Sequence, residues 1–243
     1  MTLSWLNPAG GLRYHVRALS SSRGWGPFRV ALGSWLSTFE PRTSRAVLVG
    51  PSAGYTLPDE FLRRFTAIAI LEPDPIAGFL LTRRLRRLGI SELRLERRDQ
   101  LLRPLLDGSA GLAEVLEADP ELCLIFGNVL GQTRFLLDES QFERFKAAFR
   151  ERIGPLLVTR AWLSFHDRLS GVLSPKFESP YLAASRLDDR AVLRDLYPSE
   201  PSGSVELFDH QSDGFFPSEL PHAYFDWQID GSRHHLIEAV KSR

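Results

Sequence analysis

The sequence predicts an α/β fold with a doubly wound, mostly parallel sheet of seven strands, closed at its C-terminal end by an antiparallel hairpin. Short apolar runs at 46–50, 67–72 and 122–127 are rich in aliphatic residues, as buried parallel strands are. Segments with helical spacing separate these runs, an alternation typical of parallel sheets with helices on both faces. Phe225, Trp227 and Ile229 alternate with polar residues before an Asp230-Gly231 turn, and with the segment 233–240 that follows they predict the hairpin.

The elements follow in order along the chain. A helix is expected over 29–39, ended by Pro41. The remaining predicted strands are 92–97, 156–164, 223–229 and 233–240, and helices are predicted near 58–65, 75–88, 110–118, 138–152 and 189–196. A single domain results, with a helical cover at 1–44, a nucleotide-binding core at 45–165, a variable substrate or lid insert at 166–222 and the hairpin at 223–243.

The content of charged residues indicates which class of molecule the protein binds. The chain of 243 residues has 30 basic and 30 acidic residues, so its formal net charge at pH 7 is zero. The overall charge therefore gives no attraction to nucleic acid or to an anionic membrane. A small-molecule substrate is therefore expected, whereas the oligomeric state is not indicated. No targeting signal or membrane-spanning apolar run is visible, and the one cysteine, Cys123, lies in an apolar run, so we expect a cytoplasmic protein without disulfides.

The segment from Arg45 to Asp74 contains the strongest functional signal. An apolar strand breaks into a turn of small residues, a short helical piece follows, and a second apolar strand ends in Glu72. Glycines in such a turn let the backbone approach a ligand, and an acid about 20 residues further on can accept hydrogen bonds from ribose hydroxyls. This order predicts a nucleotide-binding unit.

The same features resemble class I S-adenosylmethionine-dependent methyltransferases. The resemblance covers roughly 45–165 and, in topology, the final hairpin. It implies S-adenosyl-L-methionine as the cofactor and methyl transfer to an oxygen, nitrogen or carbon of an acceptor. The cofactor-binding residues that it implies are the turn (Gly50, Pro51, Ser52, Ala53, Gly54, Tyr55), the ribose acid Glu72 with Pro73 and Asp74, the adenine-contacting Asp99 and Gln100, and Asn128 and Val129 at the end of the fourth strand.

The turn departs from the family pattern. No acid precedes its first glycine, Ser52 stands where the middle glycine is common, and Pro51 lacks a backbone N–H donor. A non-catalytic protein that binds S-adenosylmethionine is therefore an alternative, as is another nucleotide binder such as a nicotinamide enzyme, or a tight turn without a ligand.

The turn also matches G-x-S-x-G, the nucleophile elbow of serine hydrolases, in which Ser52 would be the nucleophile. An acid and a histidine follow in the appropriate order: Asp209 or Asp213, then His222 or His234. However, no convincing strands precede the turn, and a hydrolase gives Glu72 no role. The hydrolase is the second interpretation.

Histidines are candidates for a general base because their ordinary pKa lies near neutrality. His166 is expected directly after the fifth strand, at the sheet edge that carries the cofactor, and His210 is a second candidate. His234 and His235 are neighbours in a predicted strand, so their side chains should point to opposite faces and cannot hold one metal ion as a pair. No metal-binding spacing is present, and no metal site is expected.

Overall fold

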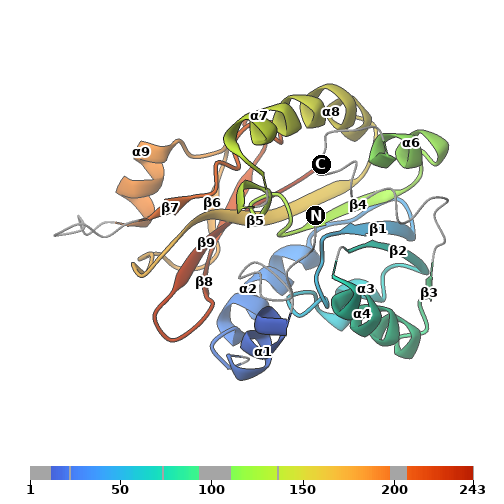
Figure 1. Cartoon of the computed structure of the whole chain (residues 1–243), viewed down its shortest axis with the longest axis horizontal. Helices are drawn as coiled ribbons and strands as arrows, with labels where there is room; N and C mark the ends of the chain where they lie inside the picture. The colour runs from blue at the N-terminus through green and yellow to red at the C-terminus, as the bar shows by residue number, and fades with distance from the viewer. Residues whose placement is uncertain are drawn as a thin grey trace.

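The computed structural model describes residues 12–21, 23–72, 74–92, 111–135, 137–197 and 207–242, apart from a few side chains at element ends. These residues form a nine-stranded sheet in the order β3-β2-β1-β4-β5-β9-β8-β6, with β7 beside β5 (Figure 1). The α/β prediction is confirmed. The predicted count of seven strands is wrong, because the insert contributes two additional short strands, β6 and β7.

The strands pair as a parallel core with an antiparallel C-terminal end. They are β1 (Arg45–Val49), β2 (Ala67–Leu71), β3 (Ser91–Glu92), β4 (Cys123–Gly127), β5 (Trp162–Gly171), β6 (Tyr181–Ala183), β7 (Phe208–Asp209), β8 (His222–Gln228) and β9 (His234–Lys241). Strands β1 to β5 are mutually parallel, and β9 lies antiparallel between β5 and β8. The predicted hairpin is therefore confirmed, while most of the strand predicted at 92–97 falls outside the described residues.

Helices cover both faces of the sheet. They are α1 (Leu12–Ser20), α2 (Gly26–Ser37), α3 (Asp59–Leu62), α4 (Pro75–Arg87), α6 (Gly111–Ala118), α7 (Glu139–Ala148), α8 (Gly154–Leu157) and α9 (Asp189–Ala191). A 3₁₀ turn, η2 (Thr133–Phe135), and two π-helical turns, η3 (Phe149–Ile153) and η4 (Val192–Leu196), complete the helical segments of the described residues. Asp74 begins α4 by accepting from the N–H groups of Ile76 and Ala77, and Pro75 supplies a favourable first residue.

Two apolar layers pack on opposite faces of the sheet. Leu48 of β1 faces a core that includes Phe28 of α2, whereas its neighbour Val49 faces a core that includes Phe142 and Phe145 of α7. Figure 1 shows α1 to α4 on one side of the strands and α6 to α8 on the other. Because these central strands are buried from their second residue onward, they read as continuous apolar runs in the sequence.

The fifth strand differs from its prediction. It spans Trp162–Gly171 rather than 156–164, and residues 154–157 form α8 instead. Pro155 stands in the first turn of that helix, where proline is favoured. As a result, His166 and Asp167 lie inside β5 and not beyond it.

The role of the insert, residues 166–222, in binding a substrate or closing over it as a lid stays a prediction.

Every helix in the described part of the chain is too short or too polar to cross a lipid bilayer.

Candidate functional site at the carboxyl edge of the sheet

The order of the strands identifies the edge where a ligand is expected. From β1 the chain continues through β2 and β3 on one side, and β4 and β5 lie on the other. The order therefore reverses between β1 and β4, and open α/β sheets bind ligands outside the carboxyl ends of the strands at such a reversal. The predicted glycine turn follows β1 there, and Asn128 and Val129 follow β4.

The glycine turn packs closely on the loop after β4. Gly50 has a left-handed backbone with φ of 61°, and its N–H donates to Leu71 O over 2.8 Å. A Cβ at Gly50 would lie 2.6 Å from Val129 Cγ2 and collide with Val129 Cβ. The structure thus brings together two segments that were predicted to contact the same cofactor. Ser52 also has a left-handed backbone, with φ of 51°.

Glu72 faces this turn from the end of β2. Its Oε2 accepts from Ser52 N over 2.6 Å, and its Oε1 accepts from Asp74 N over 3.0 Å. Burial raises the pKa of Glu72 to about 7, although the two N–H donors oppose the shift. A carboxylate offers about four acceptor positions, so this one retains capacity for additional hydroxyl donors. A carboxyl group with a pKa this far from its usual range marks a candidate site.

Helix α1 lies over the same edge. His15 Nδ1 is 2.8 Å from the Tyr55 hydroxyl, and His15 Nε2 is 3.2 Å from Asp74 Oδ2. Burial raises the pKa of the neighbouring Tyr14 above its usual value, and the nearby carboxylates of Asp167 and Glu72 raise it further. Helix α1 thus contacts the glycine-turn edge through His15, whereas α2 packs against β8, and the role of residues 1–44 as a cover stays a prediction.

Asp167 is the centre of a polar cluster that the sequence analysis did not identify. Its Oδ1 is 2.8 Å from His235 Nδ1, and its Oδ2 accepts from Asn128 Nδ2 over 3.2 Å and from Gln132 Nε2. Its own N–H donates to Asn128 Oδ1 over 2.8 Å. Burial alone would raise the pKa of Asp167, but His235, His210 and Asn128 outweigh burial and hold the pKa at about 2.

His210 joins this cluster from the end of β7. Strand β4 pairs with β5 as far as Phe165, and β7 pairs with the later residues Leu169 and Ser170 of β5. His210 Nδ1 donates to Gly131 O over 2.9 Å, because a carbonyl can only accept, and its Nε2 lies 3.0 Å from Ser170 Oγ. Burial lowers the pKa of His210, so its imidazole is neutral at pH 7. The structure therefore brings two predicted site residues, Asn128 and His210, to Asp167.

His166 lies on the opposite face of β5 from Asp167. Its Nδ1 is 2.9 Å from Ser164 Oγ, and its ring stacks on Phe216 at a centroid distance of 6.0 Å. Burial lowers the pKa of His166 to about 4, so it is neutral at pH 7. Neighbouring residues of a strand point to opposite faces, which separates this imidazole from the cluster around Asp167. The expectation that His166 emerges at the cofactor edge is wrong, because β5 continues past it.

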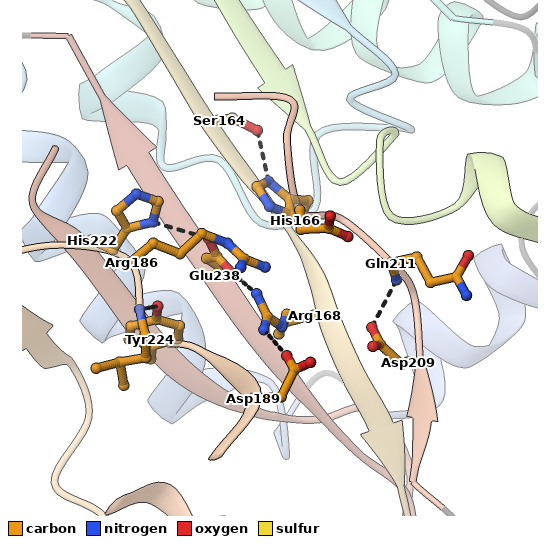
Figure 2. A network of polar contacts seen from close by, with 12 residues as sticks. Ser164, His166, Arg168, Arg186, Asp189, Asp209, Gln211, His222, Tyr224 and Glu238 are labelled. Atoms are coloured by element: carbon orange, nitrogen blue, oxygen red, sulfur yellow. Dashed lines mark hydrogen bonds and ion pairs between the residues drawn. The ribbon is translucent and has the colours of Figure 1, made fainter. Parts of the chain in front are cut away.

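The face that holds His166 also buries an ionic network (Figure 2). Glu238 of β9 pairs with Arg168 Nη1 at 3.0 Å, with Arg186 Nε at 2.9 Å and with His222 Nδ1 at 3.0 Å. Burial would raise the pKa of Glu238, but His222, His166 and Arg168 lower it below its usual value. The network ties the insert to β5, β8 and β9.

The acid–histidine pairs of the hydrolase interpretation lie far from Ser52. His222 belongs to β8, and His234 belongs to β9 and is 2.8 Å from Asp226 Oδ1. Strands β4 and β5 separate β9 from β1, which corresponds to about 14 Å at the usual spacing of strands. His234 and His235 contact different acids, as their opposite directions predicted.

Pro73, Asp99 and Gln100, which were predicted to contact the cofactor, lie outside the described residues.

Comparison with known proteins gives weak likenesses only. No family model matches the chain, and no curated protein matches its sequence. A solved structure described as an S-adenosylmethionine-dependent methyltransferase from Clostridium acetobutylicum ATCC 824 is 7% identical, with a TM-score of 0.34 over 94% of this chain and 79% of that one. A structure described as PH0851 is 13% identical, with a TM-score of 0.35 over 90% of this chain and 46% of that one. The chain thus spans less than half of the second protein, and both TM-scores are too low to carry a functional argument.

Proposed function

We propose that the protein binds S-adenosylmethionine at the carboxyl edge of β1, β2 and β4 and transfers its methyl group to a small-molecule acceptor. The observation that carries the proposal is the Glu72 carboxylate, bonded to Ser52 N of the glycine turn at the reversal of strand order. Ribose hydroxyls are the donors that an acid at this position binds in α/β nucleotide sites. The neutral formal charge of the chain favours a small acceptor over nucleic acid.

The residues present fit the adenosine part of this cofactor better than its methionine part. Glu72 has acceptor capacity for hydroxyls, as described above. In contrast, Pro51 has no N–H, and the N–H of Ser52 is already bonded to Glu72, so the turn has few donors for a carboxylate. Non-catalytic binding of the cofactor therefore stays the alternative, and an assay of methyl transfer distinguishes the two.

In the proposed reaction, the bound cofactor supplies an electrophilic methyl group, and the chain positions the acceptor. The loop that holds Asn128 is fixed by Asp167 and lies next to the glycine turn. His210 has its proton on Nδ1, but its side chain is fully buried and its Nε2 lies 3.0 Å from Ser170 Oγ, so we assign it no proton transfer in this reaction. The insert and α1 would exclude water from the site.

Isothermal titration with S-adenosylhomocysteine tests the proposal. Binding is expected in the parent protein, and Glu72→Gln should weaken it by about 1–3 kcal/mol, because an amide cannot replace both acceptor oxygens of the carboxylate. Glu60→Gln on the exposed surface of α3 is the matched control and should bind as the parent does. Absence of binding in the parent, or an equal affinity in Glu72→Gln, would refute the site.

Parallel titrations with NAD separate the nicotinamide interpretation, since a preference for NAD would favour it. Covalent labelling by a fluorophosphonate that disappears in Ser52→Ala would favour the hydrolase.

The affinity for S-adenosylhomocysteine should rise with pH. With its pKa at about 7, Glu72 is mostly protonated at pH 6 and mostly ionised at pH 8, and the ionised form accepts hydroxyl hydrogen bonds more strongly. A gain of roughly tenfold between these values is expected if only the ionised form binds. Asp74, Tyr14 and His15 also face this region, so the profile of Glu72→Gln supplies the reference. A profile equally steep in that variant would assign the dependence to another group.

A further inference from the structure

The cluster around Asp167 has a composition that suits a metal ion. Within the described residues, a carboxylate oxygen of Asp167 and one ring nitrogen each of His210 and His235 all lie within 4.8 Å of one another. We propose that these three side chains bind a divalent transition-metal ion, with Zn²⁺ as the representative species. Two imidazoles and one carboxylate favour zinc and its first-row neighbours over Mg²⁺ or Ca²⁺, which prefer oxygen ligands.

Three neighbouring strands bring the ligands together. Asp167 lies on β5, His235 lies on β9, and His210 follows β7, which pairs with β5. The register between β5 and β9 shifts between Asp167 and Leu169. The Cα partner of Asp167 is Ile237, so the hydrogen bond to His235 crosses the ladder diagonally.

The separations are close to those that a bound ion requires. Ligand atoms at about 2.1 Å from a tetrahedral zinc ion lie about 3.4 Å apart. Asp167 Oδ1 and His235 Nδ1 are 2.8 Å apart, so a metal ion would replace the proton of their hydrogen bond with a small widening. All three ligand atoms lie within 4.8 Å of one another, so a bound ion would draw them together by at most about 1.4 Å.

Neighbouring residues hydrogen-bond to Asp167 and His210 and orient them, as the residues around the ligands of known metal sites do. Asn128 and Gln132 both donate to Asp167 Oδ2, which leaves Oδ1 for the ion. His210 donates from Nδ1 to Gly131 O, and its Nε2 therefore carries the lone pair that a metal ion needs. Ligation through Nε2 requires only that the Ser170 hydroxyl direct its hydrogen elsewhere.

The sequence offers a matched control. His234 and His235 are adjacent in β9, but His234 contacts Asp226 and His235 contacts Asp167. Zinc titration of chelator-treated protein by calorimetry, together with metal content after gel filtration, should give one ion per chain. His235→Gln should weaken the affinity by roughly 100-fold or more, whereas His234→Gln should leave it unchanged.

Additional measurements keep the test independent of folding and of methyl transfer. Circular dichroism identifies any variant that fails to fold, and Asp167→Asn, which preserves side-chain shape, provides a second loss of binding. Bound Co²⁺ should show visible absorption typical of nitrogen and oxygen ligands, and excess Mg²⁺ should not displace it. The proposal is overturned if the parent binds no zinc, if His235→Gln binds as the parent does, or if His234→Gln loses equal affinity. Each titration omits the cofactor, so failure here leaves the proposed function unaffected.

Discussion

Gly50→Ala should destabilise the protein by about 2–5 kcal/mol. Gly50 has φ of 61°, a region that costs an L-residue about 1–2 kcal/mol. In addition, the new Cβ would collide with Val129, and overpacking of this kind costs about 1–3 kcal/mol. Urea unfolding followed by tryptophan fluorescence measures the loss. Because the collision moves the loop after β4 away from the turn, binding of S-adenosylhomocysteine should fall as well.

Gly89→Ala separates the two contributions to this loss. Gly89 also has a left-handed backbone, with φ of 74°, but a Cβ there would meet nothing within 4 Å. We therefore expect a cost of about 1–2 kcal/mol from the backbone alone. If both variants lose the same stability, the contact between the turn and Val129 contributes nothing, and the close packing of these two segments would be refuted.

Arg168→Met should destabilise the fold by about 3–5 kcal/mol. The Arg168 side chain is only 2% exposed and donates from Nη1 to Glu238 Oε2 over 3.0 Å. Removing one partner of a buried ion pair leaves the other charge desolvated and only partly compensated, which has a large cost. Arg186 and His222 retain their contacts with Glu238, so the lower half of this range is expected. The free energy of unfolding at pH 7 provides the measurement.

Arg194→Met is the matched control for that variant. Arg194 also pairs with a carboxylate, that of Asp195, but its side chain is 72% exposed. Exposed ion pairs contribute little, because water already solvates both charges, so no measurable change is expected. If both variants lost the same free energy of unfolding, the loss would come from removing an arginine as such and not from the burial of Glu238.

The half of the fold that contains the glycine turn was predictable because its signals are local. Strands β1, β2 and β4 are covered on both faces, which leaves uninterrupted apolar runs in the sequence. Glu72 is separated from Ser52 by 20 residues, and a single strand–turn–helix–strand unit places them together. The sequence therefore predicted that Glu72 and the glycine turn lie together, whereas their binding of a cofactor stays a proposal.

The fifth strand was misplaced because its buried residues are polar. His166, Asp167 and Arg168 interrupt the apolar pattern after Phe165, and a sequence pattern cannot show that partners from distant segments satisfy them. Glu238, for example, is 70 residues from Arg168. The residues before the strand contain enough aliphatic side chains to resemble one, although Gly154 and Pro155 begin a helix.

The cluster around Asp167 could not be assembled from spacing for the same reason. His235 is 68 residues from Asp167, and His210 reaches Gly131 across 79 residues. The available signals were weaker: Asp167 stands beside His166, which was considered, and opposite directions for His234 and His235 were correctly expected. That expectation excluded a metal site formed by both histidines, but it did not exclude that each histidine contacts a different acid.

The position of β9 has a consequence for synthesis on the ribosome. At about 5–20 residues per second, roughly 3–14 s pass between the addition of Asp167 and that of its partner His235. During this interval β5 lacks β9 on one side, and a free strand edge invites pairing with other chains. Charged residues that point inward discourage such pairing. We therefore expect Asp167 and the other polar residues of β5 to disfavour pairing with other chains until β9 is in place.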